Sequence, residues 1–165
     1  MSHRSRSWVR RRLRSLALLE LFNVPFQAAV WFGMVGLPVT AANAVGFGLC
    51  AFLLLEGAAY WWAKLRRLDA PGTALPGIRI FRLLRVLNVP VLAAGVLFAL
   101  WKAVEDPGGG SWPGLCFAVF AVLEHVNYFH VQLMYDTPED LRYLRDRGLR
   151  RSHLARDLVR PGSPG

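Results

Sequence analysis

Long apolar segments alternate with short arginine-rich segments along this chain of 165 residues. Four apolar segments are long enough to be transmembrane helices, because crossing the hydrocarbon core of a bilayer takes about 20 residues of α-helix. They lie at about residues 16–37, 42–63, 83–101 and 112–135. The segments between them are short and rich in Gly, Pro or charged residues, which are typical of loops. The pattern therefore predicts an all-α integral membrane protein whose spans form a four-helix bundle.

The distribution of positive charge predicts how the chain is oriented in the membrane. Of the 20 lysines and arginines, all but Lys102 lie before the first span, between the second and third spans or in the first turn of the third (Arg85), or after the fourth. Basic residues concentrate in cytoplasmic loops, so both termini and the middle loop are predicted to be cytoplasmic. Such an arrangement requires an even number of spans, which agrees with the four apolar segments.

We therefore expect three parts in the chain: a basic cytoplasmic N-terminal segment, a four-span transmembrane domain and an arginine-rich cytoplasmic tail. Their bounds are 1–15, 16–136 and 137–165. At the start of the tail, Thr137 and Pro138 are followed by two acidic residues, and this order favours a helix N-terminus. We predict a tail helix to about Val159, with Gly148 as a break and a disordered end.

The four spans contain an internal repeat. The first and third spans begin with an Asn-x-Pro motif, whereas the second and fourth share a Leu-Glu-x-x-x-Tyr motif. The asparagines and prolines are Asn23, Pro25, Asn88 and Pro90, and the glutamates and tyrosines are Glu56, Tyr60, Glu124 and Tyr128. The motifs thus predict two tandem helical hairpins of the same topology, related by an axis along the membrane normal.

The repeated polar residues are the first candidates for a functional site. Their distances from the flanking basic residues predict that Asn23, Glu56, Asn88 and Glu124 form a ring in the cytoplasmic half of the bundle. Tyr60 and Tyr128 lie one helical turn after the two glutamates. Ionisable residues inside a membrane are costly and often functional, so the ring would hold a cation, a proton or a polar headgroup. Alternatively, it provides only hydrogen bonds between helices.

The fourth span contains further polar residues at its end, among them His125 and His130. With Glu124, these histidines would suit an intramembrane enzyme that acts on a lipid or a quinone. Their spacing of five residues places them on different faces of a straight helix, which disfavours a metal or haem held by both. We therefore predict no cofactor and no metal site, and an enzyme is the less favoured interpretation.

The net charge of +9 would raise the question of nucleic-acid binding in a soluble protein. In a membrane protein the same charge serves orientation and contact with anionic lipids, so no nucleic-acid partner is predicted. The preference for arginine over lysine is typical of a GC-rich bacterial genome, which places the protein in a bacterial cytoplasmic (inner) membrane. Neither a phosphate-binding loop nor a hydrolase motif occurs.

We expect a small binding or transport-type membrane protein, or an accessory subunit of a membrane complex. A bundle of this size can hardly form a complete pathway alone, so the lipid bilayer and either a second copy or a larger membrane partner are the expected surroundings. A third interpretation is a structural scaffold whose tail binds a cytosolic partner.

Overall fold

The computed structural model describes residues 3–70, 73–133, 142, 145–146 and 148–159, and the side chains from Arg6 onwards within these ranges. These residues form helices and a single isolated β-bridge, with no strand among them. The elements are α1 (His3–Ala28), the π-helix η1 (Ala29–Met34) that continues it, α2 (Ala41–Asp69), α3 (Ile78–Glu105), α4 (Trp112–Phe129) and α6 (His153–Val159). The fold is therefore all-helical.

Three helical segments are long and apolar enough to cross a membrane: Arg6–Met34, Ala41–Asp69 and Ile78–Glu105. Many of their large apolar side chains face outward, for example Phe22 and Val104, which are 62% and 74% exposed. A soluble monomer rarely exposes so much apolar surface, whereas lipid tails would cover it. These features indicate a membrane protein. The fourth predicted span corresponds to α4, which has 18 residues and does not belong to these three.

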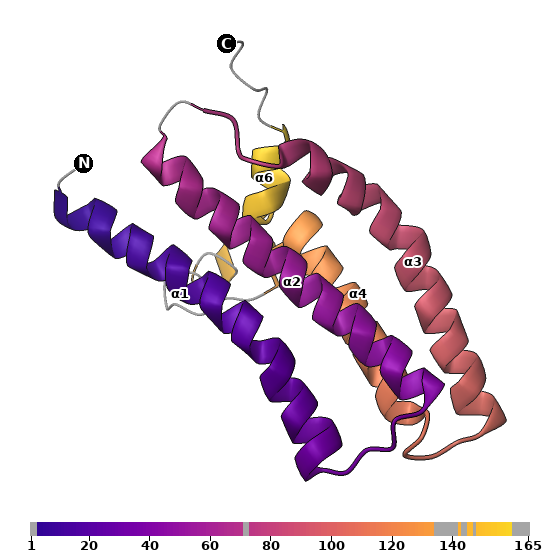
Figure 1. Cartoon of the computed structure of the whole chain (residues 1–165). Coiled ribbons are helices and arrows are strands. Elements are labelled where there is room, and N and C mark those ends of the chain that lie inside the picture. Colours follow the sequence, from indigo (N-terminus) through magenta and orange to yellow (C-terminus); the bar gives the residue numbers. More distant parts are fainter. Residues whose placement is uncertain (1–2, 71–72, 134–141, 143–144, 147, 160–165) are drawn as a thin grey trace.

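Helix α2 is central to the arrangement, because it packs against α1, α3 and α4 (Figure 1). The loops that connect α1 to α2 and α3 to α4 lie together at one end, which we call the loop end. The short helix α6 lies at the opposite end, beside the start of α3 and the end of α4, and we call this the α6 end.

Helix α4 ends at Phe129, although the apolar pattern predicts a span to about Tyr135. The chain turns at His130, and Val131 forms an antiparallel bridge with Arg151. The side-chain oxygen of Asn127 accepts a hydrogen bond from the backbone N–H of Leu133 (2.8 Å), which satisfies a donor after the helix end. The chain after α4 is thus held by hydrogen bonds outside the helix, one of them to the side chain of Asn127. The predicted start of the tail helix, at Thr137, lies outside the described residues.

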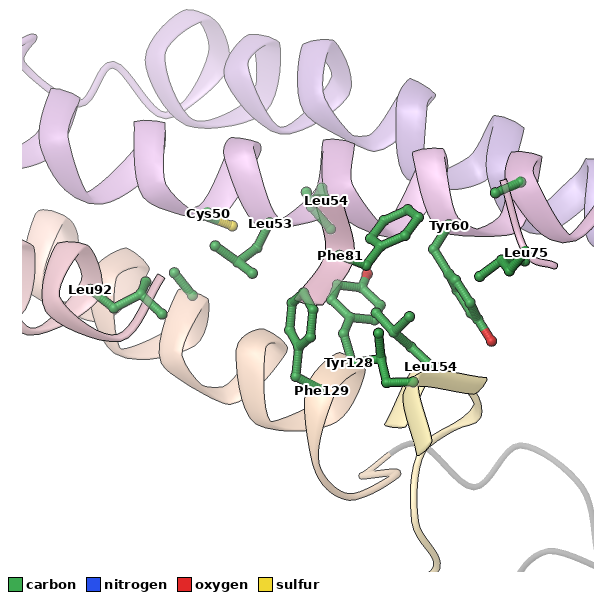
Figure 2. Packing of buried hydrophobic residues seen from close by; sticks show 13 residues of the cluster. Cys50, Leu53, Leu54, Tyr60, Leu75, Phe81, Leu92, Tyr128, Phe129 and Leu154 are labelled. Carbon is green, nitrogen blue, oxygen red and sulfur yellow. The ribbon is translucent and has the colours of Figure 1, made fainter. Parts of the chain in front are cut away.

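The hydrophobic core is largest near the α6 end (Figure 2). Tyr60 of α2, Phe81 of α3 and Phe129 of α4 meet there, and Leu154 of α6 completes the cluster. Ser152 caps α6, because its hydroxyl accepts a hydrogen bond from the N–H of Ala155 (3.1 Å). The last described helix therefore packs its apolar face onto the membrane-spanning helices of its own chain.

Candidate functional site

The structure joins two of the predicted site residues by hydrogen bonds in the middle of the molecule. The side-chain amide of Asn88 on α3 donates to both carboxylate oxygens of Glu56 on α2, at 2.8 and 3.1 Å. Both side chains are buried. Because each is a large polar group within an apolar surrounding, the pair fixes the relative position of α2 and α3.

A second polar cluster joins α1 to α4 through Tyr128. The Tyr128 hydroxyl donates to a carboxylate oxygen of Glu20 at 2.7 Å, and it also interacts with Glu124 one turn earlier on α4. Glu124 in turn accepts a weak hydrogen bond from Asn127 (3.4 Å). The hydroxyl of Tyr128 is therefore hydrogen-bonded to Glu20 and lies near Glu124, so that both carboxylates belong to one cluster. We call these three residues the carboxylate pair with its bridging tyrosine.

Space for Tyr128 depends on a glycine of α2. A Cβ atom on Gly57 would lie 2.5 Å from the Tyr128 hydroxyl oxygen and 2.6 Å from the ring carbon that carries it. Since carbon atoms do not approach this closely, any larger residue at position 57 would displace the ring. Gly57 thus allows the bridging hydroxyl to reach α1.

None of the glutamates Glu20, Glu56 and Glu124 forms an ion pair with a described basic residue. The ion pairs in the described part of the chain are Arg10–Asp69, Lys64–Asp157, Arg67–Asp157, Lys102–Glu105 and Arg145–Asp146. Glu20, Glu56 and Glu124 belong to none of these pairs. Their negative charge must therefore be compensated in another way.

Asn23, the fourth residue of the predicted ring, is not joined to the others. Its half-buried side chain makes no hydrogen bond with a described residue. Of the four predicted ring residues, only Glu56 and Asn88 are hydrogen-bonded to each other. On α1, it is instead Glu20, one turn before Asn23, that is hydrogen-bonded to α4.

Tyr60, predicted to act beside Glu56, instead binds the tail. Its hydroxyl donates to Asp157 of α6 at 2.8 Å, and Lys64 and Arg67 form ion pairs with the same carboxylate at 3.3 and 3.7 Å. Asp157 is only 9% exposed. The two copies of the Glu-x-x-x-Tyr motif thus use their tyrosines differently: one binds the tail and the other binds α1.

His153, the first residue of α6, is an exposed residue whose ring packs against Trp61, with 6.0 Å between ring centroids. Desolvation by its surroundings, together with the charges of Lys64, Arg156 and Arg150, lowers the pKa of His153 from 6.5. Its imidazole is therefore neutral at neutral pH. The tail consequently contributes no histidine charge to a region that is already basic.

Replacing Asp157 by Asn is expected to release α6 from the helices. The substitution would leave Lys64 and Arg67 without their carboxylate, and breaking a partly buried ion pair costs on the order of 2 kcal/mol or more. Hydrogen exchange of the amides of His153–Val159 should become roughly tenfold faster or more in the Asn variant. Asp146→Asn is the control, since Asp146 pairs with Arg145 at an exposed position. Equal exchange rates in the Asp157 variant and the native protein would contradict this role.

His125 of α4 and His130, the residue that follows the helix, are neighbours in the structure. Their ring centroids are 5.5 Å apart, because the chain turns at His130 and brings its ring back toward α4. His125 is buried and packs on Phe129, with 4.9 Å between ring centroids. Across the described residues, no group of three or more His, Cys, Asp or Glu side chains is arranged to hold a metal ion.

Comparison with known protein families, curated proteins and solved structures finds no match.

Glu20 and Asp157 are the site residues that reasoning from the sequence did not select. Both positions are unusual in the sequence. Glu20 is the one acidic residue of the first apolar segment, and Asp157 is the one acidic residue among the arginines that follow Gly148. A carboxylate in such a position needs a partner. Its partner, however, comes from a distant part of the chain in each case.

Proposed function

We propose that this protein is a membrane protein of binding or transport type, or an accessory subunit of a membrane complex, that binds a proton at the carboxylate pair Glu20 and Glu124. The observation that carries the proposal is the hydrogen bond from the Tyr128 hydroxyl to Glu20 beside Glu124, with no basic side chain of the described residues paired to either carboxylate. The rest of the proposal depends on what two such carboxylates require.

Two carboxylates in a surrounding of low dielectric constant do not both ionise readily, because their charges repel each other and neither is well solvated. A single proton shared by the pair removes most of this repulsion. A hydroxyl can accept one hydrogen bond while it donates another. Protonated Glu124 could therefore donate to Tyr128 while Tyr128 donates to Glu20, and reversing both bonds would move the proton from one side to the other.

Glu56 is a second carboxylate of the interior, and its role in the proposal is different. Both of its oxygens accept from the Asn88 amide, so it is held by a neutral donor. We propose that Glu56 and Asn88 connect the hairpins and position α2 beside the carboxylate pair, which has no such amide bridge between its two members. Of the site residues predicted from the sequence, Glu124 and Tyr128 belong to the proposed proton site, and Glu20 is added to them.

The proposed arrangement in the membrane has four spans, with α4 as the fourth. Its 18 residues correspond to about 27 Å of helix at 1.5 Å per residue, which is close to the thickness of the hydrocarbon core. The concentration of basic residues on one side supports cytoplasmic termini in a bacterial inner membrane, with the α6 end inside. The Asn-x-Pro and Glu-x-x-x-Tyr motifs support an internal repeat of two hairpins.

A proton site alone does not make a route across the membrane. The carboxylate pair lies between α1 and α4, and α1 packs chiefly against α2, leaving much of its apolar surface outward. We propose that a second copy of the chain or a larger membrane partner covers this surface. An accessory subunit that supplies one protonatable site to a larger pathway fits this arrangement.

Infrared spectroscopy of the purified full chain in lipid nanodiscs tests the proposal. The native protein should show the carbonyl band of a protonated carboxyl group near neutral pH, and Glu124→Gln or Glu20→Gln should remove or shift it. Tyr128→Phe should shift the band, because the bridging hydroxyl is lost. Glu105→Gln is the control, since Glu105 is exposed and ion-paired with Lys102 at 2.6 Å.

The proposal is wrong if the native protein shows no protonated carboxyl band at neutral pH, or if the band is unaffected by both substitutions in the pair. If the band disappears only in Glu56→Gln, the protonated carboxyl group is Glu56 and not the carboxylate pair. This result would also contradict the proposal.

The other two interpretations receive less support from the geometry. For an intramembrane enzyme, a histidine would need a carboxylate to orient it as a base, but the charges that act on His125 come from His130 and Arg85. For a scaffold with a partner-binding tail, the apolar face of α6 would need to be available. Leu154, Ala155 and Leu158 are instead buried in their own chain.

A further inference from the structure

His125 is a buried polar side chain without a hydrogen-bonding partner. It is 4% exposed, and neither of its ring nitrogens makes a hydrogen bond. Most buried polar atoms in proteins have a partner, and an exception needs a reason such as a functional role or a bound water or ion. In contrast, the buried polar side chains Asn43, Glu56 and Asn88 all have partners.

The groups around His125 are basic. The ring of His130 lies beside it, and the charge of Arg85 on α3 acts on both imidazoles. Arg85 is half-buried and pairs with no acidic group of the described residues. Lys64 and Arg67, at the same end of the molecule, both have Asp157 as a counter-charge. The group of Arg85, His125 and His130 has no such counter-charge in the described part of the chain.

We propose that Arg85, His125 and His130 form a binding site for a phosphate-type oxyanion between α3 and α4 at the α6 end. Arginine suits this ligand because its planar guanidinium can donate two parallel hydrogen bonds to phosphate oxygens. A protonated imidazole donates from either nitrogen, which would satisfy the buried ring of His125. The exposed ring of His130 lies beside that of His125 and would donate to the same anion.

Two sources supply this chemistry: the headgroup of a phospholipid and a free phosphate. The end of α4 and the arginine-bearing start of α3 fit the headgroup level of the membrane proposed above, which favours a lipid. The anion site itself does not depend on the proposed proton site, since the two share no residue.

Nitrogen NMR of the full chain labelled at histidine tests the site. The chain has four histidines, so the signals of His125 and His130 can be assigned with one substitution each, and those of His3 and His153 serve as internal references. The protein is kept in a maltoside detergent, which carries no phosphate group. Inorganic phosphate, phosphatidylglycerol and, as a control for ionic strength, sodium chloride are then added separately.

We expect phosphate, phosphatidylglycerol or both to shift the ring nitrogens of His125 and His130, with sodium chloride having no such effect. A response to the lipid alone assigns the site to a headgroup, and a response to phosphate alone assigns it to a free anion. If neither compound shifts the His125 signals, the ring is satisfied by water or remains unpaired, and the proposal is wrong.

Variants distinguish specific binding of the anion by these side chains from non-specific attraction to a basic surface. Arg85→Gln and His125→Phe should each weaken binding roughly tenfold, because a hydrogen bond to a charged group is lost. The phenyl ring can keep the packing of His125 on Phe129. Arg79→Gln removes the same charge from an exposed position of α3 and should leave binding unchanged. Equal weakening by Arg79→Gln and Arg85→Gln would overturn the proposal.

Discussion

Replacing Gly46 by alanine is expected to separate α2 from α4 and to be among the most destabilising single changes in this protein. A Cβ atom at Gly46 would overlap the carbonyl oxygen of Gly114 and lie 2.7 Å from its carbonyl carbon. These are backbone atoms, which cannot move aside as the end of a side chain does. Inserting a methyl group into a closely packed interface costs about 1–3 kcal/mol even where side chains can adjust, and here the helices must move apart.

Gly48→Ala is the matched control for this prediction. Gly48 lies on the same helix, and nothing lies within 4 Å of the position of its Cβ atom. Alanine is favoured over glycine inside a helix by roughly 0.5–1 kcal/mol, so the control should be as stable as the native protein or more so. Unfolding of each variant in mixed detergent micelles, followed by circular dichroism, gives the free energies. Similar stability for both variants would show that α2 and α4 do not approach as closely as described.

The helical parts of the fold could be predicted from the sequence because their lengths follow from the bilayer. Three predicted spans correspond to helices of sufficient length and apolarity. The helices are nevertheless longer than the apolar segments: α2 continues to Asp69, beyond Ala63, because arginine and lysine continue a helix readily. The hydropathy of a segment predicts which part of a helix contacts lipid, whereas hydrogen bonds and capping determine the residue at which the helix ends. This difference also explains why α4 ends before the predicted boundary.

The candidate site was predicted only in part, because spacing along a helix does not fix its rotation toward its neighbours. The motifs select Glu56 and Asn88, and these do meet. The same repeat would bring Glu124 to Asn23, but in α1 it is Glu20 that accepts the hydrogen bond from α4. The partner of Tyr60 lies 97 residues later, in the tail. No local pattern contains such a contact.

Replacing Asn43 by leucine is expected to destabilise the loop end by about 3–5 kcal/mol, since each buried hydrogen-bonding group left without a partner costs roughly 1–3 kcal/mol. The amide nitrogen of Asn43 donates to the carbonyl oxygens of Pro38 (2.9 Å) and Gly109 (3.0 Å), and its oxygen accepts from the N–H of Gly114 (2.8 Å). The side chain is completely buried. One residue thus connects the start of α2 to both loops and to the start of α4.

Leucine has the same branched shape and the same number of side-chain heavy atoms as asparagine, so the substitution leaves no cavity. The loss of stability measures the three missing hydrogen bonds together with the crowding caused by the larger methyl groups. Asn127→Leu is the control, because Asn127 is only half-buried, makes one strong hydrogen bond, to Leu133 (2.8 Å), and should cost about 1 kcal/mol. Detergent unfolding gives both values, and exchange of the Gly114 amide should rise in the Asn43 variant alone. If the two substitutions cost the same, the link between the loops is not what holds this end together, and the close contact of Gly46 with Gly114 would have to position α2 and α4 unaided.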